Sequence, residues 1–147
     1  MAAIVTDIDI ARPPGEVFAY VTDPSRLGEW QAGVVSGHTE GGGAAAVGTR
    51  CVMTRRLGGA ERTVISEITE VSPPANWAIR GIDGPIRAAV SVTVRPRRGG
   101  EESRVTVSLD FSGHGIGKVL LPVVVRQARK EAPRSCQKLR NLLESPG

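Results

Sequence analysis

Residues 11–24 read ARPPGEVFAYVTDP, and this stretch says most about the fold. The pair Pro13-Pro14 ends the segment before it, because proline lacks the backbone donor that a sheet needs. Residues 16–21 then favour a short helix, since prolines precede them and the carboxylate of Glu16 lies in the first turn. The stretch therefore predicts a break in a strand followed at once by a helix.

The residues on either side extend this pattern. Residues 4–10 alternate between apolar and polar side chains, which predicts a strand with one buried face. After the first helix, Asp23 can cap a second short helix that has Pro24 in its first position. Leu27 and Trp30 would lie on one face of that second helix.

Most of the remaining chain consists of short segments with strand-like alternation, separated by glycine and proline pairs. The turn Asp83-Gly84 is typical of a tight hairpin. Regularly spaced strands of this kind predict an antiparallel meander with one apolar face that must be covered. The predicted strands are residues 34–39, 49–57, 62–71, 77–82, 86–94 and 104–111.

The buried face is clear in the last two predicted strands, where valine and leucine alternate with polar residues. In segments 49–57 and 62–82 the sequence leaves open which face points inward. Arg80 illustrates the choice: pointing inward, it could bind a carboxylate or phenolate of a ligand. The opposite orientation, which we favour, exposes Arg80 and buries Trp77 and Ile79.

The C-terminal part predicts a long helix over residues 118–144, with leucine and valine on one side. Pro133 predicts a kink near Arg129, or two helices joined there, because proline removes a hydrogen bond and clashes with the preceding turn. The glycines of segment 113–117 predict a flexible joint, or gate, before this helix. The fold class expected is α+β: about seven antiparallel strands curve round the long helix, with two short helices after the first strand.

Composition narrows the functional classes. The chain has 147 residues, for which one domain spanning 1–147 is expected. Its net charge is +4, but the 19 lysines and arginines are dispersed, so we expect no nucleic-acid binding. Cys51 and Cys136 lie far apart, and His38 and His114 do not complete a zinc site, so we expect free thiols, no metal and no cofactor.

The first residues lack the basic and apolar regions of a signal peptide, and no apolar run is long enough to cross a membrane. We therefore expect a cytoplasmic protein without membrane insertion, present as a monomer or a homodimer.

One set of residues, spread over essentially the whole chain, forms a pattern shared with a known superfamily. Its members are Ile8, Ile10, Pro13–Phe18, Asp23-Pro24, Trp30, Gly48-Thr49, Glu70–Pro74 and Leu139–Glu144. In these residues the chain resembles the START-like, helix-grip superfamily, also called SRPBCC or polyketide cyclase/dehydrase. The resemblance implies a ligand between the concave sheet and the C-terminal helix. The family includes lipid carriers, hormone receptors, cyclases and chaperone-associated domains, so the resemblance does not fix a reaction.

Candidate ligand-binding residues follow from the inward faces of the strands and of the long helix. Trp77, Trp30, Tyr20 and Phe111 could line a pocket, although each is more often plain core, and Phe111 is the best candidate. The candidates are Val90, Val92, Val105, Val107, Leu109, Phe111, Met53, Leu120, Val124 and Gln127.

Candidate catalytic residues are fewer. Asp110 and His114 could form a carboxylate–histidine pair at the cavity mouth and transfer protons, or could simply face solvent. Glu131, with Gln127 one turn away, could act as a general acid or base on the inward side of the helix, or belong to a solvated face. Neither cysteine has a neighbouring histidine in the sequence that would make it a nucleophile.

Three functions remain. The first is a non-catalytic binder or carrier of a small hydrophobic or aromatic molecule. The alternative is a cyclase or dehydratase acting on an aromatic or lipid-like substrate, which would need two oriented polar groups in the pocket. A second alternative is a protein-interaction module of the chaperone-activator type, against which the lack of a recognisable exposed apolar stripe argues.

Overall fold

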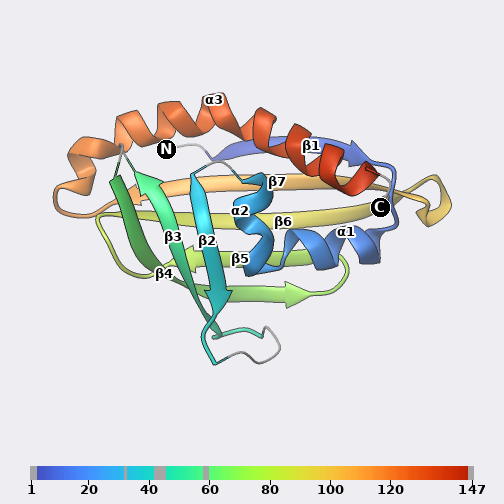
Figure 1. The fold of residues 1–147 in the computed structure, drawn as a ribbon, viewed down its shortest axis with the longest axis horizontal. Coiled ribbons are helices and arrows are strands. Elements are labelled where there is room, and N and C mark those ends of the chain that lie inside the picture. The colour runs from blue at the N-terminus through green and yellow to red at the C-terminus, as the bar shows by residue number, and fades with distance from the viewer. Residues whose placement is uncertain (1–2, 32, 42–45, 58–59, 146–147) are drawn as a thin grey trace.

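The chain forms an antiparallel sheet covered by helices, as Figure 1 shows for the computed structural model. The structure describes residues 3–31, 33–41, 46–57 and 60–145. In this part of the chain a seven-stranded sheet has the order β1-β7-β6-β5-β4-β3-β2, and the predicted α+β class is confirmed. The strands are β1 Ile4–Ile10, β2 Val34–Thr39, β3 Arg50–Leu57, β4 Ala60–Ser72, β5 Asn76–Gly81, β6 Ile86–Arg97 and β7 Glu102–Gly113.

The two short helices after the first strand are present as predicted. Helix α1 spans Pro14–Val21, and the turn η1 at Pro24–Arg26 leads into α2 at Leu27–Trp30. The side chain of Asp23 caps η1, because its Oδ1 accepts a hydrogen bond of 3.0 Å from the backbone nitrogen of Ser25.

Strands β6 and β7 form a long hairpin that lies between β1 and β5. Their register runs from Ile86 opposite Gly113 to Arg97 opposite Glu102, so both strands extend beyond the predicted bounds. The turn η2 at Arg98–Gly100 closes the hairpin, with Gly99 at a φ of 71° that glycine adopts without strain. The inward positions predicted for both strands are buried or half-buried.

Helix α3 spans Gly117–Glu144 and crosses the sheet, contacting β1, β6 and β7. It is a single continuous helix that arches over the sheet in Figure 1, so the expectation of two helices joined near Arg129 is wrong. Pro133 and Arg129 are both exposed on α3. The carbonyl that Pro133 leaves without a helical donor can therefore be hydrated, and the helix continues through the proline.

The end of α3 is fixed to the segment between β1 and α1. The backbone nitrogen of Ala11 donates to Oε2 of Glu144 at 2.9 Å, and Nε of Arg12 donates to the carbonyl of Leu143 at 2.9 Å. The bond from Arg12 satisfies one of the carbonyl groups that the last turn of a helix leaves free, and the bond from Ala11 holds the side chain of the last helical residue. Leu139 and Leu143 are buried beside them, so this end of α3 packs firmly on the sheet.

Gly113 and Gly117, at the junction of β7 and α3, allow two backbone segments to pack closely. The sequence suggested a flexible joint here instead. A Cβ atom on Gly117 would lie 1.8 Å from the carbonyl oxygen of Pro85, and one on Gly113 would lie 2.7 Å from the oxygen of Gly117. Only glycine permits so close an approach of backbones. The start of α3 is therefore packed tightly against the turn between β5 and β6.

Strand β5 has the orientation that we favoured. Trp77 and Ile79 are buried in the core, and Arg80 is exposed on the other face. Among the described residues, no helix is both long enough and apolar enough to cross a membrane.

Candidate ligand-binding site

A cavity of about 650 Å³ lies between the sheet and α3. Its volume falls in the range of sites for small organic molecules. On the sheet side, the predicted residues Val107, Leu109 and Phe111 of β7 line it. On the helix side, Leu120, Val124 and Gln127 of α3 line it, together with Val123 and Ala128. Both long walls of the cavity are therefore mainly apolar.

The other predicted ligand-binding residues do not line this cavity. Val90, Val92, Val105 and Met53 lie on the predicted inward faces, but each is at most 2% exposed in the packed core. The reason is that α3 does not cover the concave face alone. Helix α1 contacts β6 and β7, and this part of the apolar face is filled by side chains.

One end of the cavity is polar, and of its residues the sequence analysis named only Trp30 as one that could line a pocket. Trp30 and Gln31 at the end of α2 line it together with Arg55 of β3. These segments are held together where the backbone nitrogen of Arg56 donates to the carbonyl of Gly33 at 2.7 Å. Nε1 of Trp30, Oε1 of Gln31 and Nη2 of Arg55 are buried, and none has a hydrogen-bond partner among the described residues.

Arg55 points into the cavity because it lies on the same face of β3 as Cys51 and Met53, both fully buried. Its burial lowers the pKa of the guanidinium to about 10, so the group stays protonated at neutral pH. The strand register places Arg62 of β4 directly opposite, on the same face. This end of the cavity therefore carries positive charge.

Glu131 also lines the cavity, from the helix side. Its Oε1 accepts a hydrogen bond of 2.5 Å from Nε2 of Gln127, one turn earlier on α3. Within the described residues, Glu131 forms no ion pair with Arg55 or Arg62. The predicted pair of polar helix residues is thus present at the site and bound together.

Asp110 and His114 lie elsewhere. They line a separate hollow of about 360 Å³ with Arg80 and Arg87. Asp110 alternates with the cavity-lining Leu109 and Phe111, so this hollow is on the opposite face of the sheet. Oδ1 of Asp110 accepts from the backbone nitrogen of Phe111 at 3.0 Å, and no hydrogen bond joins Asp110 to His114 in the described chain.

The start of α3 carries an apolar stripe that the sequence analysis did not expect. Ile116, Val119 and Val123 are each more than 60% exposed. Their spacing is that of one helix face, and Val123 also lines the cavity. The stripe therefore borders the cavity, because Val123 is among the lining residues and Ile116 and Val119 are not.

Cys136 of α3 lines the cavity and is 3% exposed. Burial raises the pKa of its thiol to about 11, and burial also raises the pKa of the Cys51 thiol. The neutral thiol persists until the pH approaches the raised pKa, and only the thiolate is a good nucleophile. No group of three or more His, Cys, Asp or Glu in the described residues could hold a metal ion.

We expect both cysteines to react at least about tenfold more slowly with a disulfide reagent at pH 8 in the folded protein than in urea. Peptide mapping by mass spectrometry after timed labelling measures the rate at each cysteine. Equal rates in folded and unfolded protein would contradict the burial and the raised pKa of Cys136.

The geometry defines a class of protein: a curved antiparallel sheet that holds a C-terminal helix over a ligand-sized cavity, which is the helix-grip fold. A family model described as polyketide cyclase / dehydrase and lipid transport matches residues 1–144. The chain therefore belongs to this polyketide cyclase/dehydrase and lipid transport family.

Individual relatives agree with this assignment. An uncharacterized protein of Mycobacterium tuberculosis, Rv1546, is 25% identical over 143 residues, covering 97% of this chain and 99% of the relative. The crystal structure of TTHA0849 from Thermus thermophilus has a TM-score of 0.75 and 17% identity, over 96% of both chains. A START superfamily protein from Mycobacterium smegmatis also has a TM-score of 0.75, with 12% identity over 98% of both chains. At these identities the solved structures support the fold alone.

Proposed function

We propose that this protein binds a small, largely apolar molecule in the cavity between β7 and α3, as a non-catalytic binder or carrier. The observation that carries the proposal is the cavity itself, about 650 Å³ with apolar side chains on both long walls. Apolar surface is removed from water when such a cavity is filled, and this supplies most of the binding free energy. The lipid transport in the family description agrees with a carrier.

A cyclase or dehydratase is the second candidate, and one observation favours it. The carboxylate of Glu131 reaches the cavity, where it could act on a bound substrate as a general acid or base. Against this role, Oε1 of Glu131 is already bound by Gln127 of the same helix. Suppose that Glu131→Gln abolishes turnover of a substrate while the affinity for that substrate is unchanged. The protein is then an enzyme rather than a non-catalytic binder.

The first test is a thermal-shift screen against fatty acids, aromatic polyketides, flavonoids and sterols. A ligand present at 100 times its Kd stabilises the folded protein by about 2.7 kcal/mol. For a chain of this size we expect the Tm to rise by about 5–10 °C with one of these classes. No rise with any class would contradict the proposal.

Cavity-filling variants show whether such a rise comes from this cavity. Val107→Trp adds a large side chain to the sheet wall, and Ala128→Phe does the same from the helix, should the first variant fold poorly. Both are expected to lower the affinity at least about tenfold. Ser91→Trp is the control, because Ser91 is exposed on the other face of β6. Unchanged binding in both cavity variants would place the ligand elsewhere.

A further inference from the structure

The polar end of the cavity holds a positive charge that forms no ion pair with the described residues. Arg55 lines the cavity there and takes part in none of the ion pairs among them. Burial alone lowers the pKa of Arg55 to about 10, and no carboxylate in the described part of the chain offsets this shift. A buried charge that lacks a partner destabilises the folded protein, unless a ligand supplies the opposite charge.

The neighbours of Arg55 also favour a ligand with a negative charge. Arg62 lies directly opposite on β4, and like charges at such cross-strand positions destabilise a sheet. Trp30 lines the same cavity, and its buried Nε1 has no acceptor in the described chain. Trp30 is therefore a second buried donor without a partner. Two buried donors and two positive charges together favour an anionic oxygen ligand.

We propose that the ligand is an apolar carboxylic acid, whose carboxylate binds the guanidinium of Arg55 and accepts a further hydrogen bond from Trp30. This inference rests on the proposed function, because it names the chemical class of the molecule bound in the cavity. The apolar body of the acid then lies along Val107, Leu109 and Phe111 of β7.

The charges at the site favour a carboxylate over a phosphate. The planar fork of an arginine matches the two oxygens of a carboxylate. Glu131 already contributes a carboxylate to the cavity lining, and a doubly charged phosphate would be repelled by it more strongly than a singly charged acid. The unpartnered Oε1 of Gln31 can accept a hydrogen bond from a hydroxyl next to the acid group.

Another arginine of the same strand provides a control. Arg50 lies at the start of β3, is exposed, and is not among the residues that line the cavity. Arg55→Met and Arg50→Met thus remove the same charge from one strand, but only the first removes it from the cavity.

The experiment measures the affinity of paired acids and neutral analogues by displacement of the neutral fluorescent probe N-phenyl-1-naphthylamine. The pairs are dodecanoic acid with 1-dodecanol, and 2-naphthoic acid with 2-acetylnaphthalene. In the unmodified protein the acid of at least one pair should bind about 10- to 100-fold more tightly than its analogue. Arg55→Met should reduce this ratio to below about twofold without weakening the neutral analogue, and Arg50→Met should leave the ratio unchanged.

Other outcomes overturn the proposal or separate it from the proposed function. Equal binding of acids and neutral analogues to the unmodified protein, or a ratio that survives in Arg55→Met, overturns the carboxylate assignment while the apolar cavity stands. Tighter binding of dodecyl phosphate than of dodecanoic acid also overturns it. If neither the probe nor any analogue binds, the proposed function itself fails. Arg55→Lys keeps the charge without the fork and should retain part of the preference.

Discussion

Gly117→Ala should lower the free energy of unfolding by about 2–3 kcal/mol, even though alanine favours helix formation more than glycine does. The reason is geometric, because the new Cβ would lie 1.8 Å from the carbonyl oxygen of Pro85 and 2.5 Å from its carbonyl carbon. The oxygen of Pro85 also accepts a hydrogen bond of 2.8 Å from the backbone nitrogen of His114, so moving it disturbs a second contact. Thermal and urea unfolding of the purified variant measure the effect.

Gly15→Ala is the control for this substitution. A Cβ on Gly15 in α1 would meet no atom within 4 Å. Alanine should therefore be neutral there, or stabilise the protein by up to about 1 kcal/mol through its helix propensity. Equal stability of Gly117→Ala and Gly15→Ala would contradict the tight packing of α3 against the turn between β5 and β6.

Leu139→Ala should destabilise the protein by about 3–4 kcal/mol, which is typical of a leucine removed from a core that cannot collapse. Leu139 is 0% exposed and belongs to the core cluster beneath α3. The bonds that Ala11 and Arg12 make to the last turn of α3 hold this end of the helix in place. The helix is therefore poorly able to move into the space that the smaller side chain leaves.

Leu142→Ala is the matched control on the same helix, because Leu142 is 41% exposed. We expect it to change the free energy of unfolding by less than about 1 kcal/mol. Urea titrations of both variants give the comparison. Similar values for the two leucines would mean that α3 does not pack on the sheet through Leu139.

The alternation of apolar and polar residues was enough to predict the strands and the buried face of β6 and β7. It could not predict where along that face a cavity lies. Val105 and Val107 share a face of β7, yet Val105 is core and Val107 lines the cavity. The difference depends on which helix covers each position, and this is a property of the tertiary structure.

The polar end of the cavity was missed for a related reason. In the segment that became β3, both faces carry apolar residues, and the sequence left the inward face open. Cys51 and Met53 lie on one face of this strand, and Arg55 is the next residue on that face. An arginine in that pattern is ordinarily assigned to solvent, because a buried charge is unfavourable without a partner.

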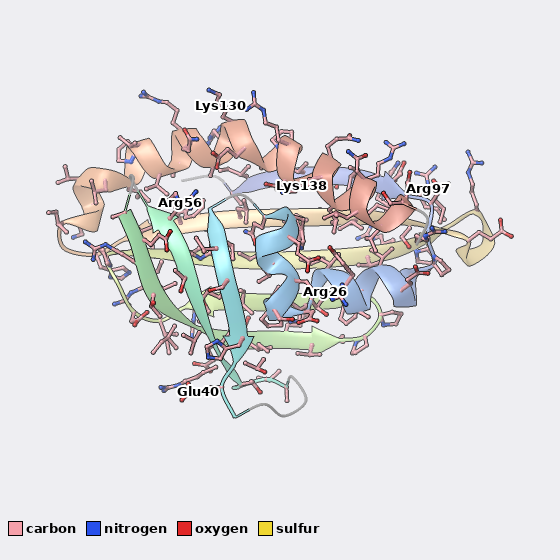
Figure 2. All side chains as sticks on the ribbon, viewed as in Figure 1. Arg26, Glu40, Arg56, Arg97, Lys130 and Lys138 are labelled. Atoms are coloured by element: carbon pink, nitrogen blue, oxygen red, sulfur yellow. The ribbon has the colours of Figure 1, made fainter. Side chains whose placement is uncertain are left out.

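Helix α3 shows where a local rule was applied too strictly. Pro133 predicts a kink near Arg129 or two helices joined there, and the second alternative is wrong, because Pro133 lies on the exposed side and the helix continues. Figure 2 shows that Lys130, one turn before it, points away from the sheet on this outer side. Proline on the solvent side of a long helix costs less than proline on the packed side, since water can satisfy the free carbonyl.

A structure of the protein with the ligand that raises the Tm most would show directly whether the ligand binds between the sheet and α3. We predict that the apolar part of the ligand lies between Val107 of β7 and Val124 of α3, inside the cavity. A ligand bound instead in the hollow beside Arg80 and His114, on the other face of the sheet, would contradict the account.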